Sequence, residues 1–139
     1  RQTSRDPWEI LRSVNIPVPP PGTVQSFYKR GSRAALTIAR VSLACSALTE
    51  NNGTIRNVRI VAGSMAPKTQ LLSVTMAFLE GKELSSGLIE EAARITSEEV
   101  KPRKNPGYRK EVTANLLRKF LLNLLERDQE GGYEVAEIP

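Results

Sequence analysis

Few side chains in this sequence can carry out chemistry. The chain has no histidine and one cysteine, Cys45. Without histidine, the usual general base, the Ser–His–Asp and Cys–His arrangements and imidazole metal ligands are all excluded. A single cysteine also excludes an internal disulfide and a cysteine-rich metal site. Cys45 falls on the apolar face of a predicted strand, where a cysteine is normally an inert small hydrophobe. An active site would therefore have to depend on lysine, acidic residues, tyrosine or a cofactor, and we predict no catalytic residue and no metal ligand in this chain.

The positive charge is concentrated in the first half of the chain. Residues 1–66 hold nine lysines and arginines against three acidic residues, whereas residues 67–139 hold eleven against twelve. Such an excess indicates either an anionic partner or solvated strands on which cations block edge-to-edge pairing. Aromatic residues make up only 5% of the chain, and no stacking platform is visible, which argues against a nucleic-acid module. No apolar run approaches the roughly 20 residues needed to span a bilayer, so we expect no membrane insertion. The unpaired cysteine favours the cytoplasm.

The elements that must position any site begin with a hairpin. Asn51-Asn52-Gly53 separates two alternating segments, and Asn-Gly fits the primed turns that match strand twist. We predict strands over 24–30, 38–48 and 54–62. In the first strand, Phe27 and Lys29 point to one side and Tyr28 to the other. In the second, the expected core face is Val41, Leu43, Cys45 and Ala47.

Helical periodicity dominates the rest of the chain. We predict helices over 68–79, from Ser85-Ser86 to about residue 100, and over 108–127, with Gly81 ending the first. Glu90 and Glu91 are expected to favour the positive N-terminal end of the second helix. The resulting fold is α+β: a three-stranded antiparallel sheet with three helices packed on one face.

Several short motifs, taken in order, resemble one family. They are Phe27 to Arg33 followed by Ile38 to Ser42, then Ile55 to Ile60, Gly63 to Pro67, Leu79 to Lys82, and Tyr108-Arg109. Together they resemble the C-terminal domain of the FAD-binding subunit of molybdenum hydroxylases of the xanthine dehydrogenase and carbon monoxide dehydrogenase type. Upstream, Glu9 to Pro17 is similar to the strand that closes the preceding FAD domain. The resemblance covers about residues 7–125.

This resemblance implies a role in electron transfer. In that family the subunit takes electrons from iron–sulfur clusters onto FAD and passes them to an acceptor, while molybdopterin chemistry occurs on another subunit or domain. The implied partners are thus an iron–sulfur subunit and a molybdopterin catalytic subunit. The implied division is 1–22 as lead and closing strand of the FAD domain, 23–127 as the flavoprotein C-terminal domain and 128–139 as a flexible tail. The resemblance implies that the chain is a component of an FAD-dependent oxidoreductase that lacks the FAD pyrophosphate loops. We expect it to be part of a longer protein and not to be catalytic alone.

Two cofactor contacts follow from the resemblance. Lys29 matches the lysine of the family's F-x-K motif, which reaches FAD, and a cation there stabilises negative charge on the flavin or its phosphates. Leu11 matches a leucine that packs on the flavin. Each also has an ordinary interpretation, as a solvated strand lysine and a core leucine. Tyr108 lies either near the flavin or subunit border, or at the surface of a helix start. The alternative function is a structural, subunit-docking domain without cofactor contact.

Overall fold

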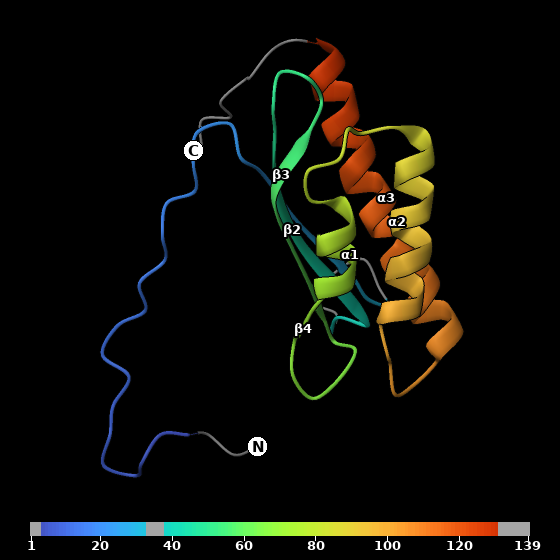
Figure 1. Cartoon of the computed structure of the whole chain (residues 1–139). Coiled ribbons are helices and arrows are strands. Elements are labelled where there is room, and N and C mark those ends of the chain that lie inside the picture. The colour runs from blue at the N-terminus through green and yellow to red at the C-terminus, as the bar shows by residue number, and fades with distance from the viewer. Residues whose placement is uncertain (1–3, 33–37, 131–139) are drawn as a thin grey trace.

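The computed structural model describes residues 4–32 and 38–130. Its strands are β1 (Val24–Arg30), β2 (Val41–Thr49), β3 (Ile55–Gly63) and β4 (Gln70–Leu71), and its helices are α1 (Ser73–Leu79), α2 (Ser86–Glu99) and α3 (Pro106–Glu130). The strands form one antiparallel sheet in the order β1-β2-β3-β4, and the helices cover one of its faces (Figure 1). The α+β prediction is therefore correct. No helix in the described ranges is both long and apolar enough to cross a membrane.

The predicted β2–β3 hairpin is present, but its turn differs from the predicted type. Only Gly53 has a positive φ, at 77°, while Asn52 does not. The Oδ1 atom of Asn52 instead accepts a hydrogen bond of 3.0 Å from the backbone N–H of Thr54. The short amide side chain therefore closes the turn by bonding to the backbone, which is a second way in which asparagine favours turns.

The sheet has four strands and not the three that we predicted. Leu71 pairs with Val61 and Gln70 with Ala62, so β4 occupies part of the segment expected to be helical. The backbone N–H of Leu72 also donates to the carbonyl of Ile60 at 3.0 Å. Because these groups bond to β3, α1 begins at Ser73 and not at Lys68, and Leu71 lies 53% exposed instead of in the core.

Two carboxylates hold α1 and the β3 backbone in place. The carboxylate of Glu99 accepts hydrogen bonds from the N–H groups of Val74 and Thr75 at 2.9 Å each, which satisfies donors at the start of α1. The carboxylate of Glu80 accepts from the N–H groups of Asn57 and Val58 at 3.0 Å each. Asn57 has φ 53°, beside a register shift between β2 and β3. Glu80 therefore supports an irregularity in the sheet.

Helix α2 begins as predicted but uses its acidic residues differently. Ser85 is the N-cap, and its Oγ accepts from the N–H of Leu88 at 3.2 Å. The first turn contains no acidic residue, so the expected interaction of Glu90 and Glu91 with the helix dipole is wrong. Both lie a turn further on and form ion pairs: Glu90 with Arg118 of α3 at 2.8 Å, and Glu91 with Arg94 at 2.7 Å.

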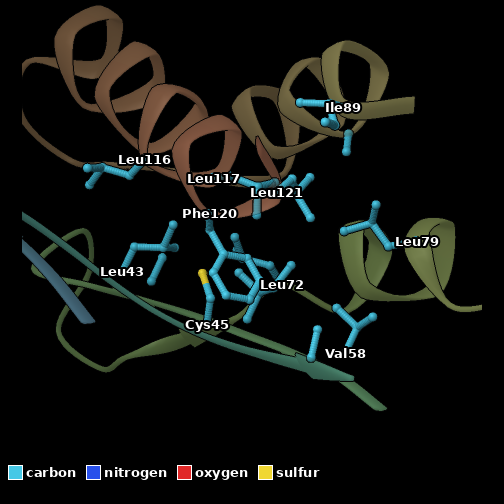
Figure 2. Close-up of a cluster of buried hydrophobic side chains, with 14 of the residues drawn as sticks. Leu43, Cys45, Val58, Leu72, Leu79, Ile89, Leu116, Leu117, Phe120 and Leu121 are labelled. Atoms are coloured by element: carbon cyan, nitrogen blue, oxygen red, sulfur yellow. The ribbon is translucent and has the colours of Figure 1, made fainter. Parts of the chain in front are cut away.

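Helix α3 lies along the sheet and completes the core. It begins at Pro106, two residues before the predicted start; proline is well suited to a first helical position because its missing N–H would have no partner there. Phe120 is fully buried among side chains such as Cys45 of β2 and Leu72, the residue before α1 (Figure 2). The predicted core positions of β2 are all buried. In α3, helical periodicity predicts an inward-facing stripe of which Val112 is partly buried and the other members are buried: Leu116, Leu117, Phe120, Leu121 and Leu124.

The segment before the sheet packs against no other part of the chain that the structure describes. Every residue from 4 to 21 is exposed and none is in a strand or helix. Figure 1 shows this segment running apart from the sheet and helices. The predicted tail falls mainly on residues 131–139, outside the described part of the chain, and α3 continues to Glu130, past the predicted end at residue 127.

Candidate functional site

The helix-free face of the sheet presents three rows of side chains. Strand pairing aligns them across β1, β2 and β3 in register, as Lys29–Ser42–Gly63, Phe27–Ala44–Val61 and Gln25–Ser46–Arg59. Alternation explains why these residues share a face, because their sequence neighbours in β2, such as Leu43 and Cys45, point into the core. The face is therefore a mixed polar and apolar surface that no helix covers.

The middle of this open face is hollowed. A shallow depression of about 400 Å³ is lined by residues of the second and third rows, including Phe27, Ala44, Val61 and Arg59. Ala44 leaves room at the centre because it has no side chain beyond Cβ. Phe27 is 69% exposed beside it. An exposed phenylalanine next to an alanine on a sheet is a suitable surface for a flat apolar group.

Lys29 lies on the same open face, in the row next to Phe27, and is not among the residues that line the depression. Its side chain is exposed, and within the described residues it has no side-chain hydrogen bond or ion pair. It is the strand partner of Ser42, so their Cβ atoms are about 5 Å apart on the open face. The structure thus places the predicted cofactor lysine on the sheet face that remains accessible.

Next to Lys29, residues of other motifs that resemble the family come together. Gly63 is the strand partner of Ser42, and a Cβ added at Gly63 would approach the Ser42 Oγ more closely than the 3.0 Å below which real contacts are not found. The following residue, Ser64, has φ 63°, and its carbonyl accepts a 2.5 Å hydrogen bond from Nη1 of Arg109. Motif residues from three strands and α3 therefore meet at one end of the sheet.

The other predicted residues lie apart from this cluster. Leu11 is 78% exposed in the N-terminal segment, so this chain alone does not bring it to Lys29. Tyr108 is 45% exposed at the start of α3, which matches the surface interpretation. Sequence reasoning placed Phe27 on the side of Lys29 but did not single out Ala44 or Val61 as lining residues. Strand alternation identifies Ala44 and Val61 as lining residues once the register that pairs them with Phe27 is known.

Cys45 has the properties of a core residue. It is 4% exposed and unpaired, and burial raises the pKa of its thiol to about 12. At neutral pH almost none of it is thiolate, the form that reacts or binds metals. Cys45 is therefore part of the core and not a candidate nucleophile or metal ligand.

The structure is thus an α+β domain with one sheet face covered by helices and the other open. The sequence family described as the CO dehydrogenase flavoprotein C-terminal domain matches residues 26–124. The match covers more than half of the chain, and the chain belongs to this family.

Similar proteins agree with this assignment. The chain is 30% identical over 146 aligned positions to the xanthine dehydrogenase/oxidase of Gallus gallus, an alignment that covers 99% of this chain and 11% of the relative. Its fold is similar to a chain of the carbon monoxide dehydrogenase of Hydrogenophaga pseudoflava, with a TM-score of 0.70, 19% identity and coverage of 81% of this chain and 40% of the other. Quinoline 2-oxidoreductase of Pseudomonas putida 86 gives a TM-score of 0.59 at 20% identity, covering 84% and 40%. These relatives are oxidoreductases, and this chain corresponds to a part of each.

Proposed function

We propose that this domain forms one wall of an FAD site and supports electron transfer in a xanthine dehydrogenase-like molybdenum hydroxylase. The observation that carries the proposal is the position of Lys29, the cation of the family motif: it is exposed on the helix-free sheet face, in the row beside the depression. The family of the chain supports the class of cofactor. FAD, when bound, accepts electrons and passes them on.

The residues of the open face fit a flavin in kind. A flavin presents a flat aromatic ring with polar edges, and the face offers an exposed ring at Phe27, a shallow floor at Ala44 and a cation at Lys29. The face lacks a glycine-rich phosphate cradle, so the pyrophosphate would be held elsewhere in the protein. This chain would then contribute contacts to the ring side of the cofactor and not the whole site.

In this arrangement Lys29 acts as a fixed positive charge. An ammonium group near the flavin favours the forms that carry negative charge. Because Lys29 has no acidic partner among the described residues, its charge is available to a ligand. Its expected role is to raise affinity for FAD and to make its midpoint potential less negative.

The N-terminal segment supports a larger assembly. Trp8, Ile10, Val14, Ile16 and Val18 recur mostly at alternate positions and are each at least 69% exposed. That period of two is typical of a strand with one apolar face. We propose that residues 1–22 include the last strand of a preceding FAD domain and connect it to this domain. That pairing would bring Leu11 to the cofactor. The further partners would be an iron–sulfur subunit and a molybdopterin subunit, in the cytoplasm.

The experiment compares Lys29→Met with Lys119→Met in the FAD-loaded enzyme that contains this domain. Lys119 of α3 is a matched control, because it is also a lysine close to β1 but lies on the helix-covered side of the sheet. Its Nζ is 5.8 Å from the ring centre of Tyr28. We expect Lys29→Met to weaken FAD binding about tenfold and to lower the flavin potential by tens of millivolts, where about 30 mV corresponds to 1.4 kcal/mol for two electrons. Lys119→Met should leave both unchanged. Equal values for Lys29→Met and wild type would remove Lys29 from the site and favour the docking alternative.

A further inference from the structure

Two loops that are distant in sequence form one basic surface. The loop that joins α2 to α3 lies beside the loop that follows β3, because the backbone N–H of Arg103 donates to the carbonyl of Met65 at 3.4 Å. Figure 1 shows both loops at the same end of the domain. We call their exposed long side chains, together with an exposed tyrosine in the first turn of α3, the basic surface: Lys68, Lys101, Arg103, Lys104 and Tyr108.

The loop between α2 and α3 is held in a defined shape. Pro102 and Pro106 fix φ at two of its positions. Asn105 adopts φ 47°, a conformation that asparagine tolerates better than most residues, and its carbonyl accepts a hydrogen bond from the N–H of Arg109 at 3.1 Å. These restraints reduce the conformational entropy that the loop would lose on binding a partner.

The charge of the basic surface is not neutralised within the described part of the chain. Its four cations form no ion pair there. The acidic residues nearest in sequence are directed elsewhere. Glu98 pairs with Arg94 at 2.6 Å, the carboxylate of Glu99 accepts from N–H groups at the start of α1, and Glu111 lines the groove between α2 and α3. The four positive charges are therefore available to an anionic partner.

Tyr108 adds an apolar anchor to these cations. Its side chain is 45% exposed. Tyrosine combines an apolar ring with a polar tip and is enriched in protein–protein interfaces. The next residue, Arg109, donates from Nη1 to the carbonyl of Ser64 at 2.5 Å, and Ser64 follows the last residue of β3. The basic surface is thus fastened to the same end of the sheet as Lys29.

We propose that the basic surface is an interface with an acidic surface of another domain or subunit of the same enzyme. Complementary charge would fix the orientation of that partner, and Tyr108 would supply the apolar contact. A single tyrosine offers no series of stacking platforms for a nucleic acid. This chain corresponds to 11% of the Gallus gallus relative and to 40% of the Hydrogenophaga pseudoflava chain, so most of an enzyme of that kind lies outside it. The inference rests on the proposed larger enzyme but not on the FAD site.

The first test treats the intact wild-type enzyme that contains this domain with a carbodiimide, which joins a lysine amine to a carboxylate in contact with it. We expect Lys101 or Lys104 to be joined to an acidic residue outside residues 1–139. The yield should fall at least about fivefold at about 1 M salt, where the screening length is only about 3 Å. Lys82 is the matched control, because it is exposed at the other end of β3, where its carbonyl accepts from the N–H of Ile55 at 2.9 Å. Lys82 should give no such product.

The second test measures hydrogen–deuterium exchange of residues 64–69 and 101–108 in the same intact enzyme. We expect Lys101→Glu/Lys104→Glu to speed exchange there several-fold, because like charges would then oppose each other across the interface. Lys101→Arg/Lys104→Arg should keep the protection of wild type, and Lys82→Glu should leave these residues unchanged.

The outcomes separate this interface from the FAD site. If neither lysine is joined to a residue outside the chain and the charge reversal leaves exchange unchanged, the interface is refuted, whatever Lys29→Met does to FAD binding. If Lys101 and Lys104 are protected from acetylation only after a DNA duplex is added, the surface binds nucleic acid and the proposal is wrong. If the cross-link forms while Lys29→Met leaves FAD binding unchanged, the interface stands and the proposed role of Lys29 fails.

Discussion

Replacing Ala44 by leucine separates the function of the open face from the stability of the fold. Ala44 lies between Phe27 and Val61 on the helix-free face, whereas Ala47 of the same strand is 0% exposed beneath the helices. A leucine at Ala44 extends into the depression of about 400 Å³. A leucine at Ala47 must be forced into a closely packed core.

The magnitudes follow from these environments. Ala47→Leu should cost about 1–3 kcal/mol of unfolding free energy, the usual cost of overpacking a core. Ala44→Leu should stay within about 0.5 kcal/mol of wild type, as surface substitutions do. In the FAD-loaded enzyme, however, Ala44→Leu should weaken FAD binding at least about tenfold, because it fills the proposed floor of the ring site; tenfold corresponds to about 1.4 kcal/mol.

The assays are urea unfolding of the chain, followed by fluorescence, and FAD titration of the enzyme that contains this domain. If Ala44→Leu lowers the free energy of unfolding as much as Ala47→Leu does, the two sheet faces do not differ in packing as the structure describes. If the Ala44→Leu variant folds normally and binds FAD with the affinity of wild type, the placement of the flavin on this face is refuted.

Two further predictions concern carboxylates of the scaffold. Glu80→Ala removes the acceptor of the N–H groups of Asn57 and Val58, and it should cost about 1.5–3 kcal/mol of unfolding free energy in urea. Glu83→Ala serves as the control, and equal losses for both variants would refute the stabilising role of the Glu80 hydrogen bonds. The hydrogen bond from Arg118 lowers the pKa of Glu90 below its ordinary value of 4.5, so the stabilisation from this pair is present above that value and is lost as pH falls through the lower folded pKa. Glu90→Gln should therefore lose less stability than wild type between pH 5 and about pH 2, and parallel pH profiles would contradict this.

The alternation of apolar residues was enough to predict most of the sheet and helices. Val24–Arg30 was predicted with its exact bounds, because Phe27 and Lys29 alternate cleanly with Tyr28. The core positions of β2 and most of those in α3 followed from the same kind of pattern. Such patterns suffice because burial depends on which face a residue occupies, and that face is fixed by local geometry.

The errors arose where distant contacts decide the local structure. Leu71 has the spacing of a helix residue, but its backbone pairs with Val61, and a local pattern does not contain that partner. Glu90 was assigned to the helix dipole, whereas an arginine 28 residues later binds it. The helix dipole is a short-range effect of modest size, and a bidentate arginine contact outweighs it.

The candidate site was only partly predictable for a similar reason. The family motif pointed to Lys29, and alternation placed Phe27 beside it. The close approach of the Ser42 hydroxyl to Gly63 depends on the register of β2 against β3. The sequence does not specify that register when a register shift is present. The contact between Arg109 and Ser64 joins residues 45 positions apart and required the structure.

Hydrogen–deuterium exchange with and without FAD tests the central claim most directly. The measurement uses the enzyme that contains this domain, first FAD-loaded and then FAD-depleted, and follows peptides from β1, β2 and α2. We predict that FAD slows exchange in β1 around Lys29 and at the start of β2 around Ser42, and that it leaves α2 (Ser86–Glu99) unchanged, because α2 lies on the opposite side of the sheet. Protection confined to the helices, with none near Lys29, would contradict the account and leave the domain with a docking role.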